Sequence, residues 1–411
     1  MNNVFVIDHM CALPIGHNLN SVIVFMNEFK KQFDRCYALV STSLPDWVEE
    51  VDLVDRCLYY PYGGLITGRI DDYPASYDYF ANLYLNAKRR LLRAFYKKIS
   101  RDHIYLKLLS NWRYIFLKYQ IDSRDLLFFP SADYYGAISL IKFIRKLPPA
   151  KRPKVHLRFI GWSEFQKYWK NEDSIFSIIK SCEDLRPQLS FSAETPRYAK
   201  LIESFLDEKI IYLPYPLCNK LTPMNESREN IISCPGQARV DKGYFRILDI
   251  AKSVEHFYGN DKRSMFVMQS MNPTDKHFNQ SYEESLIKQG NINLRAVRLS
   301  QAEINQIYSN SRVVLLPYDS DVYQYRGSAI FQECLSIGRP IVASKGLGFS
   351  DLIERYRCGY TCSTNEEFSD AICFILNKDK RDIMEDADRS RLLYMRDFNA
   401  GVQRLQFYLR G

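Results

Sequence analysis

The sequence predicts an α/β protein built from two doubly wound, Rossmann-like domains. Short apolar stretches rich in β-branched residues alternate with amphipathic helical stretches along nearly the whole chain. This alternation is typical of parallel sheets that carry helices on both faces. It is interrupted once, at the proline-containing segment 214–230, and then starts again. A length of 411 residues leaves room for two domains, each with its own core.

The elements of the first half follow from the apolar stretches and their boundaries. A helix is expected to begin at Thr195-Pro196, where an N-cap residue precedes a proline at the first helical position. The expected strands are 4–8, 37–41, 57–60, 126–130, 155–160, 189–192 and 210–213, and further helices are expected over 18–33 and 134–146.

The second half repeats this order of elements. Ser300 and Glu303 form a capping box that predicts the start of a helix over 301–308. The last stretch, 397–409, is expected to be helical. The expected strands are 231–234, 265–268, 294–297, 313–316, 341–343 and 360–362.

We therefore expect residues 1–216 to form the first domain and residues 231–394 the second, with 217–230 as the linker. The helix within 395–411 is expected to return to the first domain. The two domains are expected to face each other across a cleft, with ligands at the carboxyl ends of the strands.

Composition and cysteine usage narrow the class of protein. Hydrophobic residues make up 46% and charged residues 25%, which is ordinary for a globular protein. Ten cysteines occur singly with no CxxC pair, which indicates reduced thiols in a reducing compartment. No apolar run is long enough for a signal peptide or a membrane-spanning helix. A cytoplasmic location is expected.

The positive charge is concentrated in one segment. The net charge is +8, and residues 86–113 hold nine Lys or Arg against a single acid, Asp102. Arg90, Arg93, Lys97 and Arg101 recur at helical spacing among aliphatic and aromatic residues. Such a stretch suits an anionic membrane surface on the cytoplasmic side, or an acidic acceptor. The alternative is the solvated face of a core-packed helix. Nucleic acid is not expected, because the rest of the chain has no basic stripe or nucleic-acid motif.

A basic turn follows the first strand of the second half. Its sequence from Gly236 is GQARVDKG, with Arg239 and Lys242 as the cations. A glycine lets the backbone approach a ligand, while Arg and Lys suit a diphosphate. The turn matches neither the dinucleotide fingerprint GxGxxG nor a P-loop.

A second segment, 323–344, complements this turn. A short loop with Arg326, Gly327 and Ser328 leads into an apolar helical stretch that carries one acid, Glu333. The free amides and dipole of such a helix start attract phosphate. The acid can accept hydrogen bonds from sugar hydroxyls. Together the two segments favour a ligand that is part phosphate and part sugar.

The order of these features resembles the retaining glycosyltransferases of the GT-B fold, family 4 in particular. The similarity covers 231–377 well and the first half loosely. It includes a glycine turn (Pro14-Ile15-Gly16), a strand end reading Leu213-Pro214-Tyr215-Pro216, the turn 236–243, a strand 313–316 that ends in Pro317, and the acid at Glu333 before Gly338-Arg339-Pro340.

This resemblance implies a metal-independent, hexosyltransferase-like enzyme of surface polysaccharide or glycoconjugate synthesis. It would move a sugar from a nucleotide diphosphate donor to a glycan or lipid-linked glycan, which the first domain would bind. By the resemblance, Arg239 and Lys242 hold the diphosphate and Glu333 holds the ribose. The other implied donor-site residues are Gly16, Gly236, Arg298, Gly327 and Ser328.

The sequence departs from the family pattern at two positions. Gln237 stands where the family has arginine, so that Arg239 takes over this contact. Tyr325 stands where the family has a first glutamate near the transferred sugar, and Tyr325 or Arg326 is expected to replace part of that contact.

The resemblance also makes His156 a candidate hydrogen-bond donor in the transition state, although a buried structural histidine would fit its strand equally well. His17 is the next histidine candidate.

No cofactor or metal is expected. Asp319-Ser320-Asp321 reads as DxD, but GT-B enzymes usually stabilise the leaving diphosphate with Arg, Lys and helix dipoles. Two kinds of alternative stay open. One is another GT-B enzyme, such as a sugar-nucleotide epimerase. The other is a non-catalytic GT-B subunit that binds a glycan or a partner enzyme.

Overall fold

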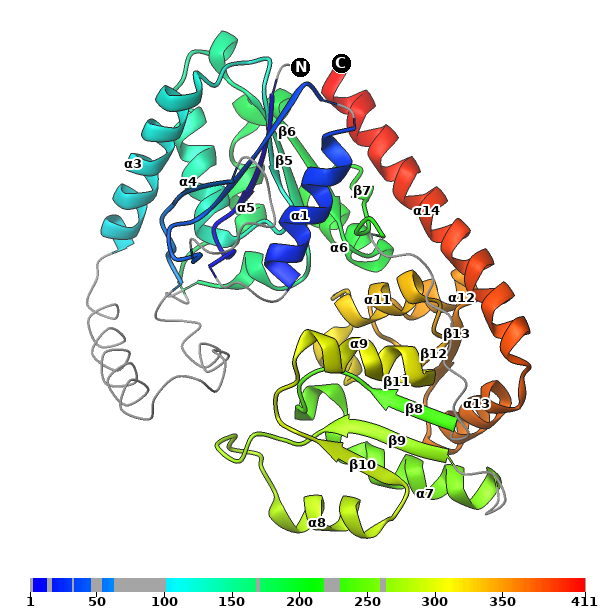
Figure 1. The fold of residues 1–411 in the computed structure, drawn as a ribbon. Helices are drawn as coiled ribbons and strands as arrows, with labels where there is room; N and C mark the ends of the chain where they lie inside the picture. The colour runs from blue at the N-terminus through cyan, green and yellow to red at the C-terminus, as the bar shows by residue number, and fades with distance from the viewer. Residues whose placement is uncertain are drawn as a thin grey trace. The chain divides into compact units, whose positions relative to one another are not determined.

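The computed structural model describes residues 3–12, 17–31, 33–45, 54–62, 101–167, 171–217, 230–258 and 264–410. The chain divides into two compact units. The first consists of Met1–Glu194, Ala199–Leu213 and Gln403–Gly411, and the second of Thr195–Tyr198 and Pro214–Val402. Each unit contains one parallel sheet with helices on both faces (Figure 1).

The sheet of the first unit has the strand order β3-β2-β1-β4-β5-β6-β7. Helix α1 lies on one face, and α3 and α4 lie on the other (Figure 1). Because both faces are covered, β4 and β6 are buried along their whole length. The elements are β1 (Asn3–Asp8), α1 (His17–Phe29), β2 (Arg35–Ser41), β3 (Val54–Leu58), α3 (Arg101–Tyr119), β4 (Leu126–Phe129), α4 (Tyr134–Ile144), β5 (Lys154–Phe159), α5 (Ile175–Lys180), β6 (Leu189–Ala193), α6 (Pro196–Leu206) and β7 (Ile211–Tyr212).

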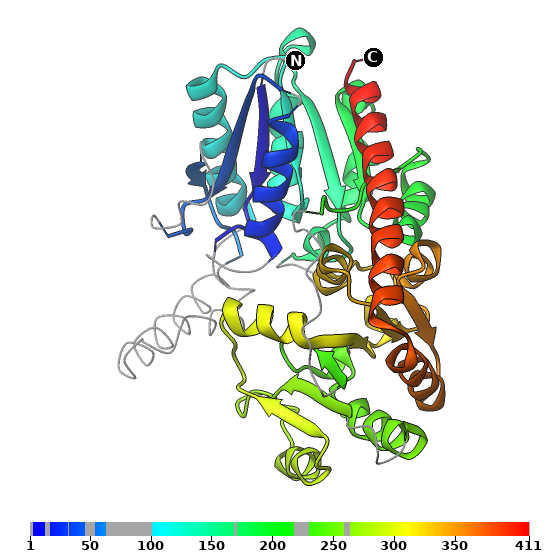
Figure 2. The same cartoon turned by 45° about the vertical axis from the view of Figure 1, so that its right-hand side comes forward.

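The sheet of the second unit has the order β10-β9-β8-β11-β12-β13. Helices α7, α8 and α13 share a core with one face, and α9, α11 and α12 lie on the other (Figures 1 and 2). The elements are β8 (Asn230–Cys234), α7 (Ile247–Tyr258), β9 (Ser264–Gln269), α8 (Gln280–Lys288), β10 (Ile292–Arg295), α9 (Gln301–Asn310), β11 (Ser311–Leu316), α10 (Ser320–Tyr323), α11 (Ala329–Ile337), β12 (Ile341–Ser344), α12 (Ser350–Tyr356), β13 (Gly359–Cys362), α13 (Asn365–Asn377) and α14 (Lys380–Arg410).

The order in which strands are added to the second sheet changes direction between β8 and β11. From β8 to β10 the successive strands are added toward one edge, and from β11 to β13 toward the other. These strands are neighbours, but α7 follows β8 on one face and α11 follows the loop after β11 on the other (Figure 1). In doubly wound sheets such a switch point leaves a crevice at the carboxyl ends of the two strands. The two segments singled out in the sequence, 236–243 and 323–344, meet at this place.

Local sequence signals gave the helix starts correctly. The Ser300 hydroxyl and the Glu303 carboxylate form the expected capping box of α9, and α6 begins at Pro196, with the Thr195 hydroxyl accepting from the Tyr198 amide. The last helix differs from the expectation. It begins at Lys380, well before 397, because no proline or glycine interrupts the pattern before Gly401.

Several side chains of helix α14 bond to the second unit, among them Arg391 to the Ser336 carbonyl (2.7 Å) and the Tyr394 hydroxyl to the Tyr215 carbonyl (2.9 Å). Asp397 accepts hydrogen bonds from Arg355 (2.7 Å) and from the Tyr356 hydroxyl (2.8 Å), both on α12. Its residues up to Val402 belong to the second unit, and those from Gln403 onward to the first.

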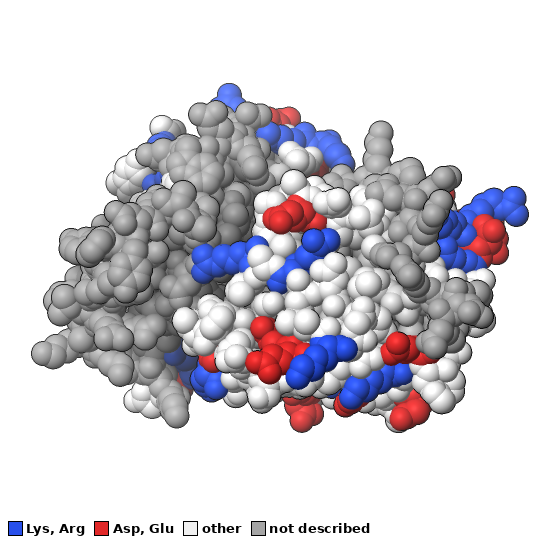
Figure 3. Space-filling model, turned by 60° about the horizontal axis from the view of Figure 1, so that its bottom comes forward, with Lys and Arg blue, Asp and Glu red and all other residues white. Residues whose placement is uncertain are grey.

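The surface of the described residues shows mixed charge. In Figure 3, basic and acidic side chains alternate over the described part of the face, and neither sign forms a continuous patch there. Within the described ranges, no helix is both long enough and apolar enough to cross a membrane.

Candidate functional site

The turn after β8 forms the base of the candidate site. Gly236 has a φ of +92°, a conformation that favours glycine. A Cβ atom at this position would lie 2.9 Å from the Lys242 ammonium and 3.0 Å from the Ile330 side chain. Lys242 and the first turn of α11 therefore close directly over Gly236. The two sequence segments predicted to form one site are brought together here.

The neighbouring strand holds the same turn in place. Gly243 has a φ of +74°, and a Cβ there would lie 2.0 Å from the Pro317 carbonyl oxygen at the end of β11. The Asp319 amide also donates to the Asp241 carbonyl at 3.0 Å. The basic turn thus packs against the loop after β11, and this close approach requires glycine at 243.

The two predicted cations of the turn differ in their surroundings. Arg239 forms a two-pronged ion pair with Asp241, with its Nε donating at 2.8 Å and its terminal nitrogen to the other carboxylate oxygen. Part of its charge is therefore neutralised within the turn. The Lys242 ammonium lies 5.9 Å from the ring centre of Tyr318, and its charge acts on Glu333. Lys242 is the better placed of the two to bind a diphosphate.

Glu333 lies in the second turn of α11 and is partly buried. Its Oε2 accepts a hydrogen bond of 2.5 Å from the Tyr308 hydroxyl of α9. Burial raises the pKa of Glu333, whereas the bond from Tyr308 and the charge of Lys242 oppose this rise. Among the described residues, Oε1 has no hydrogen-bond donor. The carboxylate is held by one oxygen and can accept from a ligand with the other.

The loop before α11 is held by backbone contacts. Ser328 is the N-cap, and its hydroxyl accepts from the Phe331 amide at 3.3 Å. The Gly348 amide donates to the Tyr323 carbonyl at 2.8 Å, and a Cβ at 348 would lie 2.6 Å from the Arg326 carbonyl. The loop after β12 thus packs against the segment that leads into the helix start predicted to bind phosphate, which includes Gly327.

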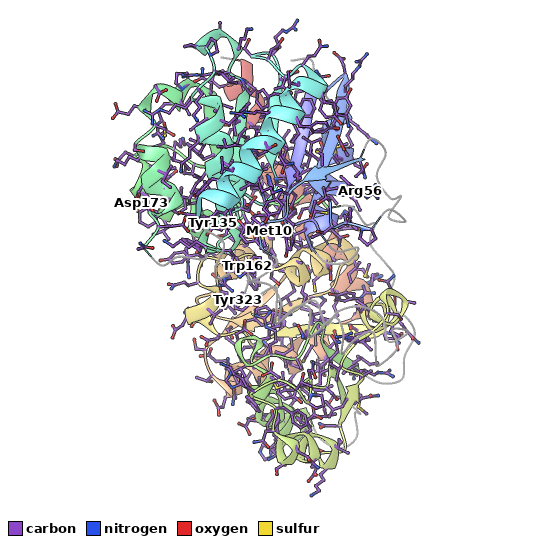
Figure 4. All side chains as sticks on the ribbon, turned by 90° about the vertical axis from the view of Figure 1, so that its left-hand side faces the viewer. Met10, Arg56, Tyr135, Trp162, Asp173 and Tyr323 are labelled. Carbon is purple, nitrogen blue, oxygen red and sulfur yellow. The ribbon has the colours of Figure 1, made fainter. Side chains whose placement is uncertain are left out.

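The two residues expected near the transferred sugar pack against aromatic rings. The Arg326 guanidinium lies over the Tyr323 ring, 5.8 Å from its centre, and Figure 4 labels Tyr323 in this region. The Tyr325 ring lies 6.0 Å from that of Tyr198, and the Tyr325 carbonyl accepts from the Thr195 hydroxyl at 3.2 Å. Both partners of Tyr325 belong to the second unit. The role predicted for Tyr325 and Arg326 remains a prediction.

A small, partly open pocket of about 30 Å³ lies between these elements. Its lining includes Gly236, Arg239, Lys242, Gln269 and Tyr318. A sugar nucleotide is far larger, so a ligand held here would lie mostly outside this pocket. The Gln269 side chain donates to the Val297 carbonyl at 2.8 Å, which fixes the loop after β10 that carries the predicted donor-site residue Arg298. Arg298 lies exposed in that loop.

His156 occupies a structural position. It is fully buried in β5, and its ring nitrogens contact the hydroxyls of Ser190 (2.8 Å) and Ser192 (2.7 Å) on β6. Burial and the charge of Arg158 lower its pKa to about 3, so it is neutral at physiological pH. With both nitrogens engaged inside the sheet, His156 fits the structural alternative and not the catalytic role.

Several predicted residues cannot be placed. Gly16, Arg90, Arg93 and Lys97 lie outside the described residues. His17 and Arg101 begin α1 and α3, but their side chains are not described.

The first unit contains a polar cluster that sequence reasoning missed. It lies at the carboxyl ends of β1 and β4 and consists of Asp8, His9, Tyr62 and Asp133, all fully buried. The Asp133 carboxylate accepts from the Tyr62 hydroxyl at 2.6 Å and lies 3.3 Å from His9 Nδ1. Met10 and Tyr135, which adjoin the cluster in sequence, lie at the same edge of the first unit (Figure 4).

The two acids of this cluster have opposite pKa shifts. Burial raises the pKa of Asp8 to about 7, and the nearby Asp133 adds to this, although Asn18 and the amides of Met10 and Cys11 donate to Asp8. Burial also acts to raise the pKa of Asp133, but His9, Tyr62 and the Gly136 amide lower it below its usual range. The signal available in the sequence was an acid at a strand end and another at a helix N-cap.

No protein-family model matches this sequence, and a comparison with curated proteins finds no match. Similarity appears at the level of structure. The catalytic domain of starch synthase IV from Arabidopsis thaliana, bound to ADP and acarbose, is similar with a TM-score of 0.62 at 12% identity, covering 100% of this chain and 99% of that one. The lipopolysaccharide outer core galactosyltransferase WaaB gives a TM-score of 0.58 at 14% identity, over 98% and 99%.

TarM is also similar, with a TM-score of 0.54 at 16% identity over 74% of this chain, which spans 58% of the TarM chain. These similarities show the fold. The chain has the two Rossmann-like domains of the GT-B glycosyltransferases, and the fold class predicted from the sequence is confirmed.

Proposed function

We propose that this protein is a retaining glycosyltransferase that moves a sugar from a nucleotide diphosphate donor to a glycan or lipid-linked glycan. The observation that carries the proposal is the meeting of Gly236, Lys242 and Glu333 at the switch point of the second sheet. It places a cation and a carboxylate at the edge where doubly wound sheets bind nucleotides. Structural neighbours solved with UDP or ADP support the class of donor.

The proposed reaction requires stabilisation of a leaving diphosphate. The bond from the anomeric carbon to the diphosphate oxygen breaks, the acceptor oxygen bonds to that carbon, and the acceptor proton passes to the diphosphate. Negative charge develops on the leaving group, so the fixed ammonium of Lys242 and the amides at the start of α11 would stabilise the transition state. Glu333 would hold the ribose hydroxyls. The proposed reaction needs no metal.

Substitutions that remove only the charge test the assignment. We expect Lys242→Gln and Glu333→Gln each to lower kcat/KM for the nucleotide sugar at least ten-fold, with thermal unfolding unchanged. Lys252→Gln is the matched control, because Lys252 is exposed on α7 outside the site. A panel of nucleotide sugars, with and without EDTA, identifies the donor and tests metal independence. Normal kinetics in both site variants would refute the assignment.

The same assay separates the alternatives. Nucleotide binding without transfer to any acceptor would favour the non-catalytic subunit, for which the missing first glutamate at Tyr325 is the supporting feature. Conversion of the donor sugar without an acceptor would favour the epimerase.

A cytoplasmic location at an anionic membrane surface is part of the proposal. Three apolar residues of the basic segment 86–113, Ile104, Leu108 and Trp112 on α3, are buried, so they do not contribute to such a surface. A different face of α3 is exposed, with Leu106 at 65%, Tyr114 at 51% and Leu117 at 80% of their surface accessible. Basic side chains at 107 and 113 are also exposed on this helix. Exposed apolar residues flanked by cations suit a membrane interface.

Vesicle binding tests this surface. We expect the double variant Leu106→Ser/Leu117→Ser to co-sediment several-fold less with anionic vesicles. Leu392→Ser on α14, where Leu392 is 71% exposed, should bind like the unmodified protein. Binding that is equally strong in all three proteins would remove α3 from the membrane proposal.

The nine cysteines of the described residues are all unpaired, which supports the reducing compartment.

A further inference from the structure

A cavity of about 510 Å³ in the second unit is not used by the proposed donor site. It lies at the carboxyl ends of β11, β12 and β13 and is closed on one side by the turn before α7. Pro317 and Tyr318 line both this cavity and the small space beneath Lys242, so the two are neighbours. A volume of this size is in the range of small-molecule sites, roughly 300–1,000 Å³.

Arg246 contributes a partly buried positive charge to this cavity. Its guanidinium donates to the Ser344 hydroxyl (3.2 Å) and to the Asn365 side-chain oxygen (3.3 Å), and it stacks on Phe368 with 5.0 Å to the ring centre. Both acceptors are neutral, and no carboxylate of the described residues pairs with it. Burial accordingly lowers the pKa of Arg246. A charge taken partly out of water without a counter-ion is unfavourable unless a ligand supplies one.

Lys345 adds a second cation to the same lining. It is exposed, and within the described part of the chain its ammonium has no hydrogen-bond or ion-pair partner. Ser320, Ser344 and Ser363 also belong to the lining of this cavity. The acid of the lining, Asp319, is exposed and caps α10 by accepting from the Asp321 amide at 2.9 Å. The lining thus offers two unpaired cations and several hydroxyl donors.

We propose that this cavity binds a phosphate group, either free or carried on a small molecule. Arginine can grip a phosphate with two parallel donors, and lysine and serine complete such a shell. Because the cavity is much larger than one phosphate, it leaves room for a body of about sugar size. The site is separate from the donor diphosphate site, since it is lined by Arg246 and Lys345 and not by Lys242 or Glu333. The proposal does not depend on the transferase activity.

Calorimetric titration at constant ionic strength tests the proposal, with inorganic phosphate, glycerol 3-phosphate and uncharged glycerol as the probes. We expect both anions to bind and glycerol not to bind. Lys345→Gln and Arg246→Gln should each weaken anion binding at least ten-fold. Lys242→Gln, at the donor site, and Lys252→Gln, an exposed lysine outside both cavities, should leave this binding intact.

The outcomes are distinct. Tighter binding of glycerol 3-phosphate supports a phosphorylated small molecule, and equal binding supports free phosphate as the ligand. Absence of anion binding, or binding lost only in Lys242→Gln, would overturn the proposal. Arg246 also joins the turn before α7 to the end of β12 and the start of α13, so its variant could fail to fold. In that case Lys345→Gln tests the proposal, because the Lys345 side chain makes no such contacts. Unchanged anion affinity in Lys345→Gln would also overturn the proposal.

Discussion

The Tyr308 hydroxyl donates a hydrogen bond of 2.5 Å to Glu333 Oε2, which joins α9 to α11. Burial raises the pKa of Tyr308 well above its usual value, so the hydroxyl stays protonated. In the bond to an ionised Glu333, Tyr308 is therefore the donor. The bond also counteracts the effect of burial on Glu333. Tyr308 therefore favours the charged form of the carboxylate and fixes the direction in which its other oxygen points.

Removing this hydroxyl should weaken nucleotide binding. We expect Tyr308→Phe to lower nucleotide affinity by about ten-fold, equivalent to about 1.4 kcal/mol, because a hydrogen bond to a charged group is lost. The pKa of Glu333 should rise, so the loss should grow as the pH is lowered. Affinity measured by titration between pH 5.5 and 8 checks this. Tyr360→Phe, an exposed tyrosine on β13, is the control, and a loss independent of pH would contradict the explanation.

Gly236→Ala should impair both stability and ligand binding. The positive φ costs about 1–2 kcal/mol for a residue with a Cβ, and the new atom would also displace Lys242 and Ile330. Gly290 provides a matched control, since its φ is +81° but a Cβ there meets nothing within 4 Å. Gly290→Ala should lower the unfolding temperature while nucleotide affinity stays normal. Equal affinity in the two variants would show that Lys242 does not act from this turn.

Asp8 should make stability depend on pH. Its folded pKa of about 7 lies above the value of 3.8 for an unperturbed Asp, so the folded state holds a proton that the unfolded state has released. The stabilisation is complete below about pH 4 and is lost as the pH rises through 7, at up to about 1.4 kcal/mol per pH unit. Asp8→Asn should flatten the dependence of unfolding temperature on pH in this interval. An unchanged slope would exclude Asp8 as its source.

Features that depend only on short segments could be predicted from the sequence. Gly236, Lys242 and Glu333 could be singled out as candidates because a glycine turn, a cation and a helical acid each leave a local signal. Tyr308 was missed because its contact with Glu333 depends on how α9 packs beside α11. The pairing of Arg239 with Asp241 was also missed, since a side chain two residues away can turn toward its neighbour or toward a ligand.

Contacts between adjacent strands also could not be predicted from the sequence. Asp133 meets His9 because β1 and β4 are neighbours in the sheet, and one sequence does not reveal this strand order. The surroundings of His156 also could not be predicted without the strand order. An alternating strand pattern brings it onto one face with Arg158, but whether that face carries a ligand or the serines of β6 depends on the partner strand.

His156→Phe distinguishes a structural histidine from a catalytic one. The new ring can keep the stacking on Phe128, whose centre lies 5.3 Å from that of His156, but it leaves the hydroxyls of Ser190 and Ser192 without their partner. Buried hydroxyls that lose a partner cost about 1–3 kcal/mol each, so the unfolding temperature should fall by several degrees. The kcat of the folded fraction should stay within about two-fold of normal, because His156 is fully buried and both of its ring nitrogens are engaged by serines inside the sheet. A loss of kcat of a hundred-fold in protein shown to be folded by circular dichroism would restore the catalytic role.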